Sequence, residues 1–537
     1  MHPPVGGNDG PDDAAENFLN WTMLYALGAP ASVLEIYKKA WEGHLRQYTE
    51  AKTVEVPLAR EGMYYKEFPV MFDWFHNGEG FSAFYLEGLC DPADRKFQQR
   101  TRRYAGFYMN EDPKRPTMIR STRSFAACST AAVGPCCARL PVKTGPVTRS
   151  SGGALFAAAW RTDYDEMIAH FQDYNDVVGD QPLNLCTTTL SLNAYALTEE
   201  QKYRDWTLEY IDAWVERTAA NGGIIPTNIG LDGTIGGEAG GRWYGGVYGW
   251  GFTVTVPQTG ELAHRTYFHV RALYGFGNAL ILTGDQRYVD TWRGVIDYIN
   301  ANAREIDGKT MWPNAYGDYF GEEDWYDWKP YPFHSGGQEV YYWSMNPDDL
   351  RLVYKNPWID YLQGKNKEYP VEALQHDLDQ VRRKVELMRA DTTTPDARLS
   401  DDPNHINPAT TEALTQLMLG GIPTGRTGAS LHARLRYFDP TQRRPGIPED
   451  VAALVEKMTA DETVVTFVNV NQIESRTVVV QGGAYGEHQI EAVTAYGKTV
   501  PVDGASFSVH LEPGSGARLT LKMKRYANQP TFAFPWV

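Results

Sequence analysis

The sequence predicts a mainly α-helical N-terminal domain, an (α/α) toroid of about six helical hairpins, followed by an all-β domain, an antiparallel β-sandwich. Two observations predict the toroid: a helix–turn–helix pattern recurs along the chain, and long insertions rich in glycine and aromatic residues separate its copies. A third predicts the second domain, because helical periodicity gives way to short β-rich runs near residue 420. We therefore expect a toroid over residues 1–420 and a β-sandwich over residues 421–537.

The clearest repeat consists of two copies of one hairpin. Residues 193–198 (NAYALT) lead through a turn into an amphipathic run from Tyr203, and residues 278–283 (NALILT) lead in the same way into a run from Tyr288. One hairpin cannot bury its apolar face alone, so repeated hairpins are typical of stacked or closed helical architectures. Weaker copies cover residues 24–37 and 86–97, where Asp, Pro and Ser supply turn and cap chemistry. The irregular spacing favours a closed ring over a solenoid.

The C-terminal part alternates β-rich runs with turns. Glycine-containing stretches such as 482–483 and 513–516 separate many of the runs, as in a sandwich of antiparallel strands. The predicted strands cover residues 464–470, 476–480, 490–494, 507–511 and 517–521.

Composition narrows the class of protein. The 537 residues are 42% hydrophobic and 22% charged, as in ordinary globular chains, and no apolar run reaches the roughly 18 residues of a transmembrane helix. A net charge of −16 argues against a nucleic-acid partner, because phosphate binding needs a basic surface. The first seven residues lack the pattern of a signal peptide, so we expect a cytoplasmic protein, or a periplasmic or secreted one whose signal has been removed. The five cysteines have no metal-like spacing; we expect no cofactor, with a divalent cation as the open alternative.

The hairpin copies predict where the long loops lie. Loops that leave equivalent hairpins leave from the same end of a ring, so residues 228–264 and 314–349 should converge on one mouth. By the same reasoning residues 72–80 and 110–149 face that mouth. A rigid scaffold that presents several loops at one end is a usual place for a functional site.

The mouth loops carry the candidate site residues. Ten glycines in residues 228–252 allow close backbone approach to a ligand, and aromatic residues between them offer stacking faces. We expect His264 and His269 to lie at the start of the next helix. The candidate catalytic residues are Tyr248, Tyr244, His264, His76 and Arg242. The candidate substrate-binding residues are Asn77, Glu79, Asn228, Glu238, Trp243, Trp250, His269, Arg120 and Trp325.

One chemistry that suits these residues is β-elimination from a uronic acid. It needs a base for the proton α to the carboxylate, neutral or cationic groups that stabilise the enolate, and an acid for the leaving oxygen. Tyrosine, histidine, arginine and asparagine fit these roles. An unperturbed tyrosine has a pKa of about 10, so a tyrosine base would need a nearby cation such as Arg242 to lower it.

The competing chemistry is glycoside hydrolysis. An inverting hydrolase needs two carboxyl groups roughly 6.5–9.5 Å apart, one protonated and one ionised. The acidic residues of the mouth loops include such pairs: Asp232 or Glu238 with Glu79, Glu322 or Glu323. Two alternative functions of other classes remain: a non-catalytic glycan-binding protein, and a toroid enzyme that acts on apolar small molecules.

Hairpins with the sequence Leu-Thr-Gly-Asp-Gln-Arg-Tyr (residues 282–288), mouth loops rich in Gly, Tyr and Trp, and a trailing β-sandwich resemble the helical-toroid polysaccharide lyases. Among these the chain is most similar to lyases that cut between rhamnose and glucuronate. The resemblance implies a polysaccharide substrate containing a uronic acid and a tyrosine base. Toroid glycoside hydrolases share this architecture, so the fold alone does not decide between the two reactions.

Overall fold

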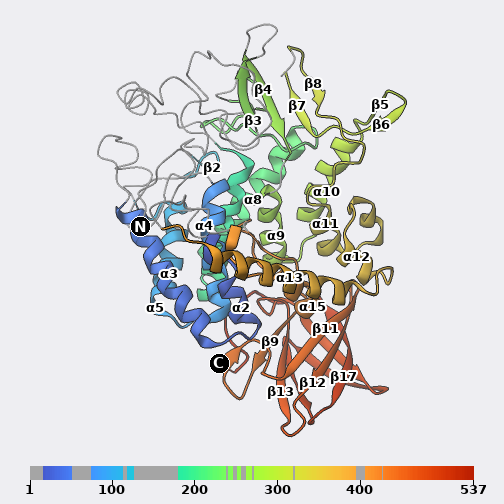
Figure 1. Ribbon diagram of the computed structural model, residues 1–537. Helices are drawn as coiled ribbons and strands as arrows, with labels where there is room; N and C mark the ends of the chain where they lie inside the picture. The colour runs from blue at the N-terminus through green and yellow to red at the C-terminus, as the bar shows by residue number, and fades with distance from the viewer. Residues whose placement is uncertain are drawn as a thin grey trace.

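The computed structural model describes residues 16–50, 74–112, 118–125, 180–237, 240–245, 251–255, 262–268, 271–318, 321–394, 405–425 and 427–536. Helices make up most of its N-terminal part, and antiparallel sheets make up its C-terminal part (Figure 1). In Figure 1 the C-terminal sheets lie below the helices, and a small sheet from the long insertions lies above them. Over the described residues, no helix has the length and apolar character needed to cross a bilayer.

The four helical hairpins expected from the repeat are present. The helix pairs are α2 (Trp21–Leu27) with α3 (Ala31–Glu50), α4 (Trp74–Cys90) with α5 (Arg95–Tyr108), α7 (Thr188–Thr198) with α8 (Gln201–Ala220), and α9 (Ala272–Thr283) with α10 (Arg287–Asn300). The helices that follow are α11 (Gly337–Ser344), α12 (Pro357–Leu362), α13 (Tyr369–Ala390) and α15 (Glu412–Leu419).

The copied threonines explain why the two clearest hairpins turn in the same way. Thr198 Oγ1 donates to the Ala194 carbonyl and Thr283 Oγ1 donates to the Ala279 carbonyl, both at 2.7 Å. Each hydroxyl oxygen then accepts the backbone N–H two residues later, at 3.2 Å and 3.1 Å. The same side chain therefore ends the first helix and fixes the turn in both copies.

The first helices of the hairpins lie side by side, and small residues allow the close approach. A Cβ atom added at Gly277 on α9 would lie 2.6 Å from the ring of Trp343 on α11. One added at Gly275 would lie 2.8 Å from Leu185, in the 3₁₀ helix η6 (Pro182–Thr187) that precedes α7. Larger residues at these two positions would force the neighbouring elements apart.

Helix α15 joins the beginning and the end of this row of helices. Thr411, the N-cap of α15, donates to Asn20, the N-cap of α2, at 3.1 Å, and Asn20 donates to the Ala409 carbonyl at 2.9 Å. At the other end of α15, the carbonyl of Gly420 accepts the hydroxyl of Tyr342 on α11 at 2.7 Å.

The chain that follows α15 fills the space between these helices. Gly428 donates its N–H to Ser82 on α4 at 3.1 Å and accepts the hydroxyl of Thr189 on α7 at 3.0 Å. Ser430 donates to Asn278 on α9 at 2.6 Å. All of these side chains are buried, so hydrogen bonds satisfy polar groups that have lost their water.

The C-terminal strands form two antiparallel sheets. The four-stranded sheet has the order β10 (Arg444–Pro445), β9 (Leu435–Asp439), β13 (Arg476–Gly482), β16 (Ser506–Leu511). The five-stranded sheet has the order β11 (Val451–Met458), β12 (Glu462–Asn469), β17 (Gly516–Lys524), β14 (Gln489–Ala495), β15 (Lys498–Gly504). Four of the five predicted runs fall within strands and the fifth, 464–470, extends one residue past the end of β12, whereas β9, β10, β11 and β15 were not predicted.

The C-terminal part covers the C-terminal ends of the first helices of the hairpins. Arg525 donates to the carbonyls of Trp343 and Ser344 at the end of α11, both at 2.9 Å. Arg436 donates to the carbonyl of Leu89 at the end of α4. Cations are favourable at this negative end of a helix dipole. The N-terminal ends of α9 and α11 therefore point away from these sheets, toward the long insertions (Figure 1).

The insertions themselves form a four-stranded sheet that was not predicted. Its order is β3 (Gly251–Thr255), β4 (Leu262–Tyr267), β7 (Ala315–Gly317), β8 (Asp324–Tyr326). The prediction that His264 lies at the start of a helix is wrong, because residues 262–267 pair with β3 and with β7, and α9 begins only at Ala272. Cross-strand pairing outweighs the local helical pattern here. Two short hairpins complete the upper part: β1 (Met118–Ile119) with β2 (Ser124–Phe125), and β5 (Arg304–Ile306) with β6 (Lys309–Met311).

Candidate functional site at the N-terminal ends of the helices

Three of the four predicted mouth segments meet at one end of the helices. Strand β4, from the insertion before α9, pairs with β7, from the insertion after α10. A Cβ atom at Gly233 would lie 2.9 Å from the Thr122 side chain, so the segment 118–125 also reaches the glycine-rich stretch. Of the fourth segment, 72–80, the described part begins α4 at Trp74. The convergence of the loops thus holds for 118–125, 228–245 and 315–326.

For several predicted residues, the structure describes only the backbone or nothing at all. His76, Asn77 and Glu79 belong to the first two turns of α4, not to a loop before it, and only their backbone is described. The same is true of His264 in β4. Outside the described residues altogether lie Tyr248, Glu238, Trp250 and His269.

Tyr244 lies among charges that do not suit a base. Its side chain is buried, and Arg242, which bonds to it, also pairs with Asp318 at 3.5 Å. Burial, together with the negative charges of Asp318 and Glu323, outweighs Arg242 and raises the pKa of Tyr244 to about 12. The arginine is near the tyrosine, as a tyrosine base would require, but two carboxylates and desolvation outweigh it, so the pKa of Tyr244 is not lowered.

The two described candidate tryptophans have different surroundings. Trp243 is half-buried and stacks on Tyr316, with ring centroids 5.0 Å apart and an interplanar angle of 27°. Trp325 is buried, contacts Tyr316 edge-on at 5.0 Å and lies 5.8 Å from Phe268. Trp243 therefore keeps accessible ring surface at the mouth, whereas Trp325 packs beneath it.

Asn228 and the glycines hold the glycine-rich stretch in shape. Asn228 Nδ2 donates to the carbonyl of Tyr244 at 2.6 Å and to that of Arg242 at 3.3 Å. Gly236 has a φ of +77°, and a Cβ atom there would lie 2.4 Å from the carbonyl carbon of Gly241. Asn228 and these glycines therefore stabilise the fold of the stretch itself. The composition of the stretch did not distinguish this role from contact with a ligand.

The remaining predicted residues lie at the periphery. Arg120 is exposed and donates to the carbonyl of Met109 at 3.2 Å. Asp232 accepts from the N–H and the hydroxyl of Thr234, which is turn chemistry. Glu322 is exposed, and Glu323 accepts the hydroxyl of Tyr316 at 2.6 Å.

Sequence reasoning missed the residues with the most perturbed environment at this end of the helices. Glu339, in the first turn of α11, is partly accessible to solvent, yet surrounding protein raises its pKa by desolvation. Tyr274, in the first turn of α9, is buried; desolvation raises its pKa well above the usual value, and the charge of Glu339 raises it further. A side-chain hydrogen bond with Thr427 and the positive charge of Arg271, the N-cap of α9, counteract part of the shift. A partly accessible group with a perturbed pKa is typical of a catalytic site.

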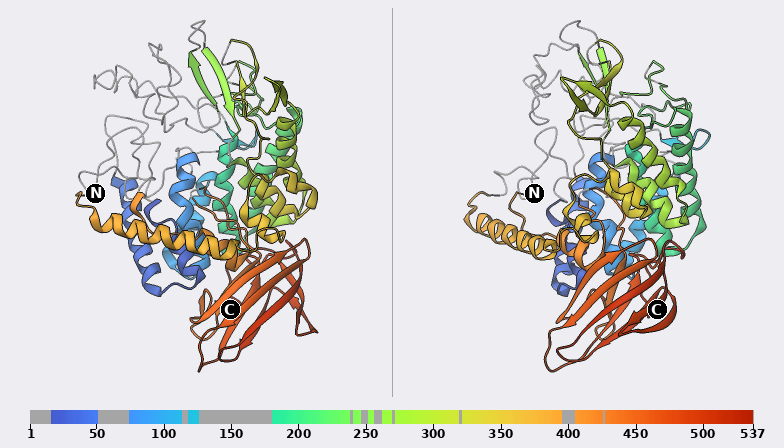
Figure 2. Two further views of the ribbon diagram at one scale, coloured as in Figure 1. Left: turned by 45° about the vertical axis from the view of Figure 1, so that its right-hand side comes forward. Right: turned by 90° about the vertical axis from the view of Figure 1, so that its right-hand side faces the viewer.

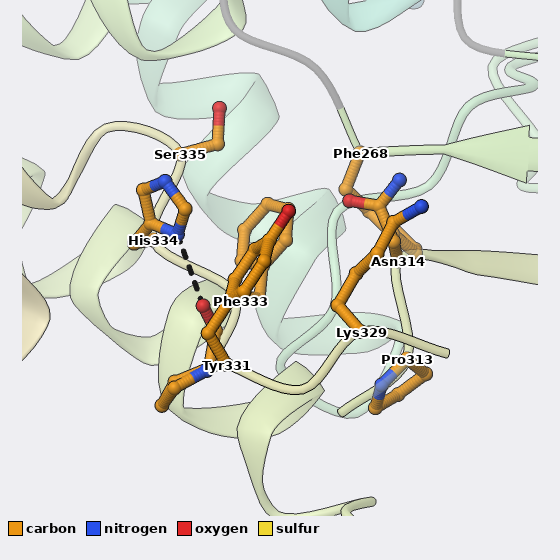
Figure 3. A pocket seen from close by; sticks show the side chains of 9 residues that line it. Phe268, Pro313, Asn314, Lys329, Tyr331, Phe333, His334 and Ser335 are labelled. Atoms are coloured by element: carbon orange, nitrogen blue, oxygen red, sulfur yellow. Dashed lines mark hydrogen bonds between the residues drawn. The ribbon is translucent and has the colours of Figure 1, made fainter. Parts of the chain in front are cut away.

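A pocket of about 270 Å³ is lined in part by His334 and Ser335 (Figure 3). These two residues precede α11 in the sequence and so lie close to Glu339 along the chain. Asp327 accepts from Asn314 at 3.0 Å and from Lys329 at 2.8 Å, which fixes both polar side chains. The pocket-lining residues are Phe268, Pro313, Asn314, Lys329, Tyr331, Pro332, Phe333, His334 and Ser335.

The ring of His334 has a defined orientation. Its Nδ1 lies 3.0 Å from the carbonyl oxygen of Pro332, an acceptor only, so this nitrogen carries the proton (Figure 3). In the neutral ring Nε2 is then a hydrogen-bond and proton acceptor. Tyr354 packs against the ring at 4.8 Å and stacks on Tyr331 at 5.0 Å. The sequence signal was present, because His334 and Glu339 both fall in the predicted mouth segment 314–349, but nothing in it distinguished them from its many other polar residues.

Within the described part of the chain, neither the thiols nor the acidic residues form a metal-binding cluster. Cys90 and Cys186 are buried, and burial raises the pKa of both thiols. No group of three or more His, Cys, Asp or Glu side chains in the described ranges is arranged to hold a metal ion.

Comparison with known proteins gives a family without a described activity. No curated protein and no solved structure matches the chain. One family, a domain of unknown function (DUF8034), matches residues 2–355 and 351–415. Because that match covers most of the sequence, the chain belongs to the DUF8034 family.

Proposed function

We propose that the protein is a carbohydrate-active enzyme, a polysaccharide lyase that cleaves a glycosidic bond to a uronic acid by β-elimination. The observation that carries the proposal is Glu339, a partly accessible carboxyl whose pKa is raised by its surroundings and whose charge acts on Tyr274, as does the charge of Arg271. A protonated carboxylic acid can donate a hydrogen bond to a developing enolate, and a cation adds electrostatic stabilisation.

The protonation states of Tyr274 and His334 suggest their roles as acid and base. Tyr274 keeps its proton because its pKa is raised, so it is suited to protonate the leaving oxygen. His334, with Nδ1 bonded to Pro332, presents Nε2 as the base that takes the proton α to the carboxylate. Lys329 and Asn314, held by Asp327, supply charge and an amide for the sugar, and Trp243 supplies a stacking face.

We also propose the finer architecture expected from the sequence. In it α2, α4, α7, α9, α11 and α15 are the inner helices of a closed (α/α) toroid, and the two C-terminal sheets are the layers of a β-sandwich. The bonds of α15 to Asn20 on one side and Tyr342 on the other support closure of the ring. The coverage of the helix C-termini by Arg436 and Arg525 supports a substrate entrance at the opposite end.

Glycoside hydrolysis is the second candidate, and the same carboxyl favours it. An inverting hydrolase needs one carboxylic acid that stays protonated to donate to the leaving oxygen, and the raised pKa of Glu339 suits that role. In that reaction the amide of a Gln at position 339 cannot replace the acid, whereas in β-elimination it still donates a hydrogen bond to the enolate.

A panel of glucuronate-containing glycans tests the proposal. β-Elimination produces an unsaturated sugar whose conjugated double bond absorbs in the ultraviolet, whereas hydrolysis produces reducing sugar without that absorbance. Binding with neither product would indicate a glycan-binding protein. The matched control for Glu339→Gln is Glu305→Gln, because Glu305 on β5 is exposed and accepts the hydroxyl of Thr310 within its own β-hairpin.

A further inference from the structure

Helix α13 carries an apolar stripe that is exposed over much of its length. The helix runs for 22 residues, about 33 Å at 1.5 Å per residue, and none of these residues is buried. Val371 is 68% exposed, Leu374 45%, Leu378 44% and Met388 46%. In the right-hand view of Figure 2, α13 projects from the body of helices at the edge of the molecule. Large exposed apolar surfaces of this kind mark interaction sites.

The spacing of the stripe is that of a coiled coil. Apolar residues alternate at intervals of three and four, as positions a and d of successive heptads do. The a positions are Val371, Leu378 and Val385, and the d positions are Leu374, Val381 and Met388. A helix that only packed on one globular body would have a broader apolar face directed inward.

Charge is segregated along the same helix. Residues 368–380 contain four acidic residues and neither lysine nor arginine. Residues 381–390 contain four basic residues and a single acidic one. Two parallel copies would bring like charges together, whereas two antiparallel copies bring each acidic half against a basic half.

We propose that α13 binds α13 of a second copy of this chain as an antiparallel, two-fold symmetric pair. In this register Val371 packs against Met388 of the partner subunit, Leu374 against the partner's Val385, and Leu378 against the partner's Val381. The symmetry repeats each contact, which gives six a/d layers.

The flanking positions match in the same register. Glu368, which precedes the helix in an e position, lies opposite the partner's Arg389, and Asp377 in a g position lies opposite the partner's Lys384. Asp377 also accepts the N–H of Ala413 within its own chain at 3.3 Å, so the Glu368 pair is the cleaner one to test.

Light scattering coupled to size-exclusion chromatography, over a range of concentrations, tests the pair. The full chain should show twice the 60.4 kDa of one copy. Leu374→Glu/Leu378→Glu should give the single mass with an unchanged circular dichroism spectrum, because both side chains are exposed in the single copy. Arg383→Glu, which lies away from the seam, is the matched control and should leave the mass doubled. A single mass for the native chain at every concentration, or a doubled mass for the Leu374→Glu/Leu378→Glu variant, would overturn the proposal.

Charge reversal tests the antiparallel register. Glu368→Arg alone and Arg389→Glu alone should each weaken association, because each puts like charges opposite one another in the pair. The double variant Glu368→Arg/Arg389→Glu restores opposite charges and should recover association. If the double variant is weaker than both single variants, the antiparallel register is wrong.

Discussion

The charge of Glu339 on α11 raises the pKa of Tyr274 on α9, so side chains from two different helices share one electrostatic environment. Both lie in the first turn of their helix, at the end that the C-terminal sheets leave uncovered. Arg271 lies at the N-cap of α9, and Thr427, from the chain that fills the helical interior, bonds to the tyrosine. The site thus depends on contacts between segments far apart in the sequence.

Glu339 should set the high-pH limit of activity. Its pKa is raised, and its proposed role requires the protonated form, so activity should fall as pH rises through that raised pKa. In Glu339→Gln the side chain cannot ionise, and this high-pH fall should disappear while part of the lyase activity remains. The measurement is kcat/KM against pH for both proteins; an unchanged high-pH limit in the variant would remove Glu339 from this role.

Tyr274→Phe should lower kcat by about 10²–10⁴-fold, the usual size of a general-acid contribution, while KM changes little. The substitution removes only the hydroxyl, and the ring still fills its buried position. Tyr331→Phe is the control, because that residue stacks on Tyr354 at the pocket rim and has no proposed proton transfer. Equal losses of kcat in the two variants would argue against a specific role for Tyr274.

Glu87 should make stability depend on pH. Burial raises its pKa from 4.5 to about 7 in the folded chain, against a hydrogen bond from Tyr37 that acts to lower it. The folded state therefore binds this proton more tightly than the unfolded state. The stabilisation is complete below about pH 4.5 and is lost as pH rises to about 7.

Relative to the native chain, Glu87→Gln should therefore gain about 2–3 kcal/mol between pH 4.5 and pH 8. Denaturant unfolding at the two pH values measures the difference. Glu35→Gln on the exposed face of α3 is the control and should show no such gain. A variant that follows the native pH dependence would assign the effect to other groups.

Arg525 should stabilise the contact between the C-terminal sheets and α11. It donates to three successive carbonyls, those of Tyr342, Trp343 and Ser344. Arg525→Met should lower the free energy of unfolding by about 2 kcal/mol, since hydrogen bonds from a charged group are lost and the carbonyls stay partly buried. Arg518→Met, which breaks an exposed pair with Glu456, should cost less than about 1 kcal/mol. Similar losses in chemical denaturation would show that the cap adds nothing beyond a surface charge.

The repeats predicted the hairpins because each hairpin is specified by residues that lie close together in the sequence. Thr198 and Thr283 carry the same turn chemistry in both copies, and the structure uses it identically. Strands β4 and β7 were not predicted, because they pair across an intervening helical hairpin and each is too short to show a periodicity.

The meeting of the long loops was predicted, whereas the roles of individual residues in them were not. The loops 228–245 and 315–326 meet as expected, yet Asn228 is used in holding one of them and Trp325 in packing beneath them. Glu339 was not distinguished because its pKa is raised by its surroundings, and a sequence does not show which segments surround a side chain.

The most direct test of the central claim is the ultraviolet absorbance of products released from glucuronate-containing glycans by the native chain, Glu339→Gln and Glu305→Gln. The account predicts an unsaturated product with the native chain and with Glu305→Gln, and a reduced rate with Glu339→Gln that no longer falls at high pH. Reducing sugar without that absorbance, abolished in Glu339→Gln at every pH, would contradict β-elimination and support hydrolysis. No product with any glycan of the panel would contradict glycan cleavage altogether.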